Sequence, residues 1–303
     1  MSGNLKKNLA FVLGATPNVA FAAGSLLLGL ERHMRGHDHD VLLIHEGIDG
    51  PDARLLEALG ARLVPYQPLH LRREALPENH PAYYLYIFEC FRLLDEYKTV
   101  IWLDCDMAVQ GDLSALAQYG PFAMAVTDSS FLRDGITYTF GRNFYKPELL
   151  REEDYDTGAP FANSGVLVLQ NPLPRPLKLY EWCIRTFEEH RSNLRHTDQA
   201  VLNMLALKFP DLYATFQAGE FNCYPLNPAS LNAKIVHCFG ARKFWNDGLM
   251  RLAFPEWHRD YLNWLDLGGS RFEGEITDRP LIRRGTYPLL CSLVEKLNSL
   301  LEK

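Results

Sequence analysis

The first 65 residues alternate short apolar runs with helix-like segments, and this alternation is the strongest constraint on the fold. The apolar runs 9–13, 40–45 and 62–65 have the length of buried strands, and the segments 19–34 and 52–59 between them have helical character. Strands that alternate with helices in this way form a parallel sheet covered by helices. We therefore expect an α/β fold with a mainly parallel central sheet, whose ligands bind at the carboxyl ends of the strands.

The pattern continues beyond residue 65 and changes near residue 247. We predict further strands at 99–103, 121–127, 166–170 and 234–236, and helices at 177–189 and 198–207. From Asp247 onward the chain has aromatic helical turns, at Trp257, Tyr261 and Trp264, and then a terminal helix. We predict one large domain, residues 1–250, and a helical C-terminal appendage, residues 251–303, that packs on this domain or on a partner.

Composition and charge exclude several classes of protein. The 303 residues are 47% hydrophobic and 22% charged, as in an ordinary globular protein. The formal net charge of −6 argues against a nucleic-acid-binding protein, because phosphate backbones select basic surfaces. The six cysteines are scattered without CxxC spacing, so they favour neither a zinc site nor a disulfide framework, and they fit a reducing compartment.

No segment of the sequence has the pattern of a secretory leader or of a membrane span. The apolar runs 9–14 and 25–30 are too short for either role, and no cleavage site follows them. We therefore expect a soluble, cytoplasmic protein.

A pair of acids follows the predicted strand 99–103. Asp104 and Asp106 are separated by Cys105, so in an extended chain both carboxylates emerge on the same side. Two like charges this close are costly unless a cation lies between them, and hard oxygen ligands suit Mg²⁺ or Mn²⁺. The pair therefore predicts a divalent-metal site with a phosphate-bearing ligand, and it points to a nucleotide sugar.

Two other interpretations of the acid pair stay open at this point. One is a solvated strand end without a function. The other is a phosphatase of the aspartyl-phosphate type, whose motif usually lies at the first strand and has Thr or Val four residues after the first acid. Here that residue is Ala108. The metal site is the interpretation that we favour.

A second cluster begins at the end of the predicted strand 234–236. His237 ends this strand, and Gly240 and Lys243 follow it. A neutral imidazole can complete a Mn²⁺ site begun by carboxylates, and a lysine can neutralise diphosphate oxygens. A glycine lets the backbone approach phosphates closely. Each residue taken alone is more simply an ordinary core or surface residue, so the cluster gains its meaning from the acid pair.

Polar residues also precede a third strand and open a late helix. Asn163 lies before the predicted strand 166–170, where it could bind sugar hydroxyls or simply form a turn. Asp198 and Gln199 follow Thr197 at the start of a predicted helix, where capping is the default role. At the edge of a cleft, the same carboxylate and amide could hold a sugar ring.

These motifs, in this order, resemble the family 8 retaining glycosyltransferases over about residues 9–245. The resemblance implies a nucleotide-diphospho-sugar transferase domain of the GT-A type, which is Rossmann-like. It implies a hexosyltransferase that moves glucose or galactose from a UDP-sugar to a hydroxyl of a glycan or glycoconjugate, with retention at the anomeric carbon. The implied cofactor is Mn²⁺ or Mg²⁺, and the implied partners are the UDP-sugar donor and a carbohydrate or glycolipid acceptor.

The resemblance also implies roles for individual residues. The metal ligands would be Asp104, Asp106 and His237, with Cys105 between the acids among the cofactor-binding residues. The uridine pocket would be lined by Ala15, Thr16 and Asn18, with Phe21 in the place of an aromatic residue near the base. Gly240 and Lys243 fall in a His-x-x-Gly-x-x-Lys motif at the phosphates. The donor sugar would be held by Asp128, Asn163, Asp198 and Gln199.

Two positions depart from the family pattern. The family usually has a basic residue upstream of the first metal aspartate, and here that position is Phe88, or Ile87 if the register slips, with only Arg92 nearby. Phe244 replaces a proline that usually follows the motif lysine. The missing cation leaves one alternative open, namely a catalytically degenerate protein that binds a nucleotide sugar without transferring it.

The C-terminal tail is basic and apolar. Arg279, Arg283 and Arg284 precede a helix-like segment that contains Leu289 and Leu293. Such a segment packs on its own domain or on a partner, including a second copy of the chain in a homodimer, or it rests on an anionic membrane as a peripheral contact. We favour packing. Membrane contact would instead favour a lipid-linked acceptor.

Overall fold

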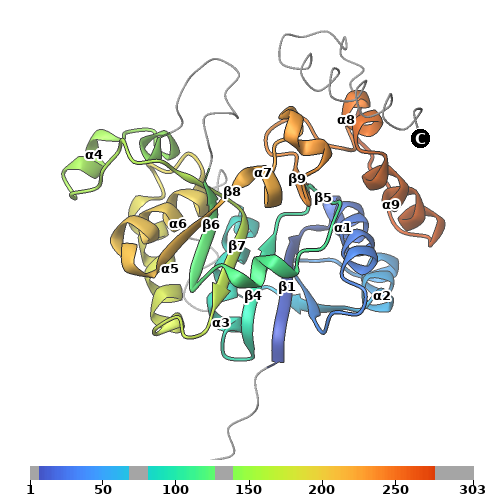
Figure 1. The fold of residues 1–303 in the computed structure, drawn as a ribbon, viewed down its shortest axis with the longest axis horizontal. Coiled ribbons are helices and arrows are strands. Elements are labelled where there is room, and N and C mark those ends of the chain that lie inside the picture. The colour runs from blue at the N-terminus through green and yellow to red at the C-terminus, as the bar shows by residue number, and fades with distance from the viewer. Residues whose placement is uncertain (1–6, 68–80, 127–138, 277–303) are drawn as a thin grey trace, which may run out of the picture.

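The structure is a computed structural model that describes residues 7–67, 81–126 and 139–276 (Figure 1). Its centre is a seven-stranded sheet, which in spatial order consists of β3 (Ala61–Pro65), β2 (Asp40–His45), β1 (Lys7–Ala15), β4 (Tyr97–Leu103), β7 (Ala162–Gln170), β6 (Phe122–Val126) and β8 (Tyr213–Gln217). Neighbouring strands are parallel except around β7, which is antiparallel to both β4 and β6. The predicted α/β fold with a mainly parallel sheet is confirmed.

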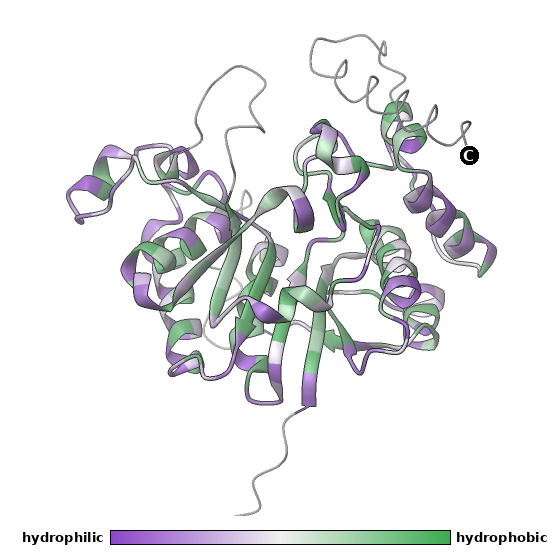
Figure 2. Cartoon of the chain, viewed as in Figure 1, coloured by the Kyte–Doolittle hydropathy of each residue, from purple (hydrophilic) through white to green (hydrophobic). Residues whose placement is uncertain are grey.

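Helices cover both faces of the sheet. One face packs against α1 (Ala20–His33) and α2 (Gly50–Ala58), and α9 (Pro255–Asp266) packs on α1. The other packs against η3 (Ala82–Phe88), α3 (Glu89–Leu93), α5 (Pro176–His190) and α6 (Thr197–Lys208). Side chains alternate along β1, so that Phe11 and Leu13 enter the first core whereas Ala10 and Val12 enter the second. Figure 2 accordingly shows hydrophobic strands inside and polar residues on the outer helices.

A second, two-stranded sheet connects distant parts of the chain. It pairs β5 (Met107–Val109) with β9 (Ile235–His237) in antiparallel fashion, and Met107 lies opposite His237. Because β5 follows the acid pair directly, this pairing carries the end of β9 to the same edge of the central sheet.

The structure differs from the sequence-based elements in one place that matters for the site. β7 begins at Ala162, so Asn163 lies within the strand and not in a turn before it. The pairing of β6 with β7 also shifts between Met124 and Ala125, which places Ala125 opposite Asn163. Asparagine and glycine are poor strand formers, and therefore the start of this strand was not visible in the sequence.

The remaining described helices are short. They are η1 (Pro17–Val19), η4 (Ser114–Gln118), η6 (Phe140–Asn143), α4 (Glu148–Arg151), η7 (Pro210–Leu212), α7 (Ala218–Phe221), η8 (Pro228–Leu231) and α8 (Gly248–Ala253). Among the described residues, no helix combines the length and the apolar character needed to cross a bilayer.

The C-terminal helix α9 packs against α1. Trp264 is fully buried there, and the hydrophobic core continues from the sheet through α1 to this ring. The predicted boundary between residues 250 and 251 falls inside α8, and the division of the chain into a domain and an appendage stays a prediction. The basic tail beyond residue 276 lies outside the described residues.

Candidate functional site

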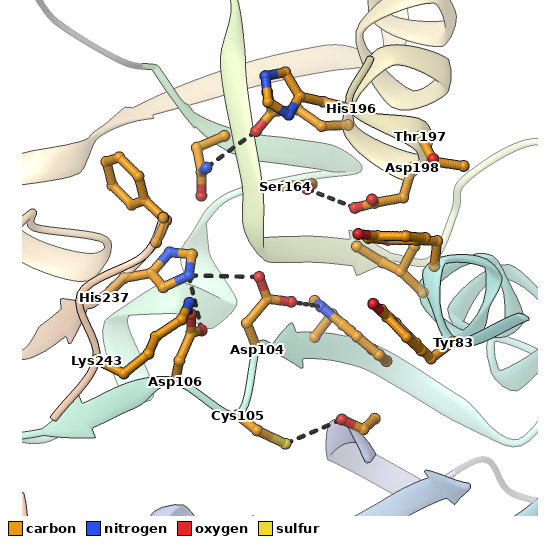
Figure 3. A pocket seen from close by; sticks show the side chains of 18 of the residues that line it. Tyr83, Asp104, Cys105, Asp106, Ser164, His196, Thr197, Asp198, His237 and Lys243 are labelled. Carbon is orange, nitrogen blue, oxygen red and sulfur yellow. Dashed lines mark hydrogen bonds and ion pairs between the residues drawn. The ribbon is translucent and has the colours of Figure 1, made fainter. Parts of the chain in front are cut away.

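A cavity of about 1320 Å³ opens where β1, β2 and β4 end. Among the residues predicted for a site, those that line it are Ala15, Thr16, Asn18, Asp104, Cys105, Asp106, Asn163, Asp198, Gln199, His237, Gly240 and Lys243. Asp128 lies outside the described residues. Figure 3 shows the acids, His237 and Lys243 pointing toward one another, with Ser164 and Asp198 beyond them. The structure thus brings segments from most of the chain to one cleft.

The two acids are held by the strands around them. The backbone N–H of Asp104 donates to the carbonyl of Gly165 on β7 at 3.0 Å, and the indole Nε1–H of Trp102 donates to Asp104 Oδ1 at 2.7 Å. The carbonyl of Asp106 accepts from the N–H of Cys238 at 2.9 Å. The backbone of each acid is therefore held by a different part of the chain, and the Asp104 carboxylate is oriented by Trp102 of β4.

His237 reaches both acids from β9. Its Nε2 lies 3.0 Å from Asp106 Oδ1 and 3.5 Å from Asp104 Oδ2, and its side chain is only 2% exposed. Its other nitrogen, Nδ1, lies 2.8 Å from Oδ1 of Asn222. One ligand atom from each of Asp104, Asp106 and His237 lies within 4.8 Å of the others. Two carboxylates and one imidazole are a donor set that suits Mn²⁺ or Mg²⁺, so these residues fit a divalent cation.

Charge within the cluster is unevenly distributed. The Lys243 ammonium contacts the Asp106 carboxylate and donates to the carbonyl of Cys238 at 2.8 Å. Burial alone would raise the pKa of Asp106, but His237 and Lys243 outweigh it and lower that pKa. Burial raises the pKa of Asp104 against the opposing effect of His237, and the Asp106 charge adds to the rise. A bound cation would compensate both carboxylates.

Cys105 points away from the metal ligands. Its thiol donates to the carbonyl of Gly14 at 3.0 Å, and burial together with the flanking acids raises its pKa. It therefore connects the acid loop to the end of β1.

Asp198 faces the cleft from the start of α6. Its Oδ2 accepts from the hydroxyl of Ser164 at 2.7 Å. Burial, and then the charge of Asp104, raise the pKa of Asp198 to about 6, although the Ser164 hydroxyl favours the ionised form. The neighbouring Gln199 is buried, and its Oε1 accepts from Nδ2 of Asn163 at 3.0 Å.

The end of the cleft at β1 contains most of the residues predicted to bind a nucleoside. Ala15, Thr16 and Asn18 line it, together with Val19 and Glu46. Phe21 is not brought to the cleft. It is 1% exposed and lies in the core, with its ring 5.3 Å from Trp245 and 5.7 Å from Tyr261. Most of α1 is buried, so its sequence does not reveal which residue faces a ligand.

The position that usually carries a basic residue is apolar. Ile87 lines the cavity and Phe88 is buried in the core. Arg92 pairs with Glu89 at 2.6 Å and is absent from the cavity wall. Among the described residues, the lysine and arginine side chains on that wall are Lys243, Arg142 and Arg195.

Several residues of the site were not predicted from the sequence. They are Trp102, Ser164, Asn222 and Asn143, which hold the predicted residues by hydrogen bonds. Trp102 could have been found, because it precedes Asp104 by two residues on the same face of β4. Asn222 lies in a bend and Asn143 ends the short helix η6, and neither position has a local sequence pattern.

Comparisons with known proteins agree with this geometry. The model of the family described as glycosyl transferase family 8 matches residues 12–248. No curated protein sequence matches the chain.

Three solved structures illustrate the likeness of fold. The apo structure of the bifunctional glycosyltransferase WbbM is 13% identical, with a TM-score of 0.62 over 88% of this chain and 52% of that chain. The chain thus spans about half the length of WbbM. The galactosyltransferase LgtC, in complex with donor and acceptor sugar analogs, is 14% identical, with a TM-score of 0.60 over 85% of this chain and 99% of that chain. The glycosyltransferase GlyE of Streptococcus pneumoniae TIGR4 is 18% identical, with a TM-score of 0.54 over 87% of this chain and 64% of that chain.

Proposed function

Because the chain belongs to glycosyl transferase family 8, we propose that it is a metal-dependent hexosyltransferase that moves glucose or galactose from a UDP-sugar to a hydroxyl acceptor, with retention at the anomeric carbon. The observation that supports this most directly is the meeting of Asp104, Asp106 and His237 in one cleft, beside the ammonium group of Lys243. A cation held by the three ligands, Mn²⁺ or Mg²⁺, would act as a Lewis acid on the diphosphate of the donor.

The other residues of the cleft would bind and orient the donor. Lys243 would share its charge between Asp106 and the β-phosphate, and loss of such a charge typically costs about 10²–10³ in rate. Ala15, Thr16 and Asn18 would contact the nucleoside, and Gly240 would let the backbone approach the phosphates. Asn163, Asp198 and Gln199 would hold the sugar; Asp128 is proposed for the same role.

We propose front-face attack as the transfer step. The bond between the anomeric carbon and the β-phosphate oxygen breaks, and the acceptor oxygen bonds to the same face of that carbon. The acceptor proton passes to the departing phosphate oxygen. A covalent intermediate on Gln199 is disfavoured, because an amide oxygen is a weak nucleophile and this one already accepts a hydrogen bond from Asn163. The Asp198 carboxylate would stabilise positive charge on the sugar ring.

The size of the cavity supports a donor with an acceptor beside it. At about 1320 Å³ it exceeds the range of about 300–1,000 Å³ found for sites of drug-sized ligands. We propose a glycan or glycolipid as the acceptor and the cytoplasm as the place of reaction. We also propose that the tail 279–297 makes a peripheral membrane contact or a homodimer. Liposome flotation of chains with and without the tail tests the membrane contact.

A UDP-release assay tests the proposed function. The protein is incubated with Mn²⁺ and, in turn, UDP-glucose, UDP-galactose and their N-acetyl forms, and we expect release from a hexose donor that stops in EDTA and in Asp106→Ala. Asp211→Ala, which changes an exposed aspartate on η7, is the control. UDP binding by calorimetry without release from any donor would indicate the degenerate binding protein that the apolar Ile87 and Phe88 allow. Full turnover in EDTA would contradict metal dependence.

A further inference from the structure

His237 stands at one end of a continuous chain of side-chain hydrogen bonds that runs to the sugar end of the cleft. The first link joins His237 Nδ1 to Asn222 Oδ1 at 2.8 Å, and the second joins Asn222 Nδ2 to Asn163 Oδ1 at 2.9 Å. Asn163 Nδ2 then donates to Gln199 Oε1 at 3.0 Å, Gln199 Nε2 to Asn143 Oδ1 at 2.8 Å, and Asn143 Nδ2 to the carbonyl of Phe140 at 3.1 Å. The side chains of Asn222 and Asn163 thereby connect the metal site to Gln199.

Two backbone groups fix the direction of this chain. The carbonyl of Phe140 can only accept, so Asn143 must turn its NH₂ group toward it and its oxygen toward Gln199. The N–H of Gly165, 3.0 Å from Asn163 Oδ1, can only donate, so Asn163 must turn its NH₂ group toward Gln199. Both constraints give the same direction at every link.

The direction determines the state of His237. Asn222 donates through Nδ2 to Asn163, and its oxygen is left to face His237. An oxygen there requires a proton on Nδ1 of the imidazole, so a ring that binds a cation together with Asp104 and Asp106 does so through the lone pair of Nε2. Asn222 and His237 are each 1% exposed. Turning the Asn222 amide around would bring its oxygen against Oδ1 of Asn163, which would leave two buried acceptors facing each other without a donor.

We propose that Asn222 is a positioning residue, which holds His237 with its proton on Nδ1 and its Nε2 aimed at the metal. Histidines that bind metals almost always donate the other ring N–H to a carbonyl or carboxylate, and here a side-chain amide takes this role. Through Asn163, the same amide ties the orientation of His237 to that of Gln199. The inference rests on the proposed function for the presence of a metal, but it can be tested without turnover.

Two substitutions at residue 222 separate the two contacts of this side chain. Asn222→Asp keeps an acceptor for Nδ1–H but cannot donate to Asn163. Asn222→Leu has a similar size and removes both contacts. A third variant, Asn193→Leu, is the control, because Asn193 is also buried and its side chain bonds the backbone of Lys146, outside the chain of amides.

Calorimetric titration with Mn²⁺ alone is the first measurement, with thermal unfolding to show that each variant is folded. We expect Asn222→Leu to bind Mn²⁺ about 10–100-fold more weakly than the wild type, the range found when the partner of a metal-binding histidine is lost. Asn222→Asp and Asn193→Leu should bind it as the wild type does. Equal Mn²⁺ affinity in the wild type and Asn222→Leu would overturn the proposal.

The imidazole ring of the wild-type protein gives a second test, which does not depend on the folding of the variants at residue 222. In ¹⁵N-labelled protein loaded with Mg²⁺, the His237 signals are assigned by their loss in His237→Asn. We expect a proton on Nδ1 and none on Nε2, and a neutral ring protonated on Nε2 would overturn the proposal. If the wild type binds no Mn²⁺ or Mg²⁺ at all, the proposed function fails, and the ring signals of the metal-free protein still show whether Nδ1 carries the proton that Asn222 requires.

Discussion

Gly165 on β7 lies directly against the imidazole of His237 on β9. A Cβ added at Gly165 would lie 2.5 Å from Nδ1 of His237 and 2.9 Å from Oδ1 of Asn163. Real Cβ atoms do not come this close to other heavy atoms, so any larger residue at position 165 must displace the ring or the strand. The glycine in this strand is therefore required by the position of the histidine and not by an unusual backbone angle.

We predict that Gly165→Ala weakens Mn²⁺ binding and lowers transfer activity by at least about tenfold, because the imidazole moves away from the two acids. Calorimetry with Mn²⁺ and the UDP-release assay measure the two effects. Gly219→Ala is the matched control, since an added Cβ there meets no atom within 4 Å. Unchanged Mn²⁺ affinity in Gly165→Ala would show that the ring tolerates displacement.

Trp102 orients Asp104 through its indole N–H, and its ring packs on Gly14, where an added Cβ would lie 3.3 Å from Trp102 Cζ2. We predict that Trp102→Phe, which keeps an aromatic ring but loses the donor, lowers Mn²⁺ affinity or activity about tenfold, as other losses of a ligand's hydrogen-bond partner do. Mn²⁺ titration and the UDP-release assay would show it. Trp182→Phe, on α5, is the control, and a loss of the same size in both variants would point to packing instead of the hydrogen bond.

The metal cluster could be predicted because its members lie at the ends of two predicted strands. Asp104 and Asp106 follow β4, and His237 ends β9. Local patterns marked both strand ends as candidate ligand sites. The resemblance to a known family then assigned His237 to the same metal as the two acids.

Residues that support the cluster could not be predicted, because tertiary contacts alone place them. Asn222 reaches His237 because the neighbouring Cys223 forms a bridge with Val236 of β9, and this pairing has no signature in the sequence. The burial of Phe21 in the core could not be predicted for a related reason. Almost every residue of the first two turns of α1 is buried, so a hydrophobic pattern gives this helix no distinct face.

The raised pKa of Asp198 predicts a pH dependence of transfer. Because burial and the Asp104 charge raise this pKa to about 6, the carboxylate that stabilises the sugar ring is lost as the pH falls through about 6. We expect kcat to rise with pH to a plateau above this value. Ser164→Ala removes a donor to the carboxylate and should move the midpoint of the kcat profile to higher pH. A midpoint that stays in place or falls would contradict this assignment.

The same raised pKa affects the free energy of unfolding. A carboxyl group whose pKa is higher in the folded state than its ordinary value of 3.8 favours the fold at low pH, and this contribution is lost as the pH rises toward about 6. Asp198→Asn should therefore be more stable than the wild type at pH 8, by about 1–3 kcal/mol, and not at pH 4. Urea unfolding at the two pH values measures the difference.

Two glycines of α1 should respond to alanine in opposite ways. Alanine favours a helix over glycine by about 1 kcal/mol, so substitution is stabilising where the space allows it. At Gly29 an added Cβ would meet Val109 and Asp260 at 3.5 Å, which is ordinary contact, whereas at Gly24 it would lie 2.5 Å from Cδ2 of the buried Trp264. We expect urea unfolding to show Gly29→Ala stabilised by about 0.5–1 kcal/mol. Gly24→Ala should be destabilised by about 1–3 kcal/mol, because α9 must move away from α1. A gain in stability for Gly24→Ala would mean that Trp264 does not hold these two helices in contact.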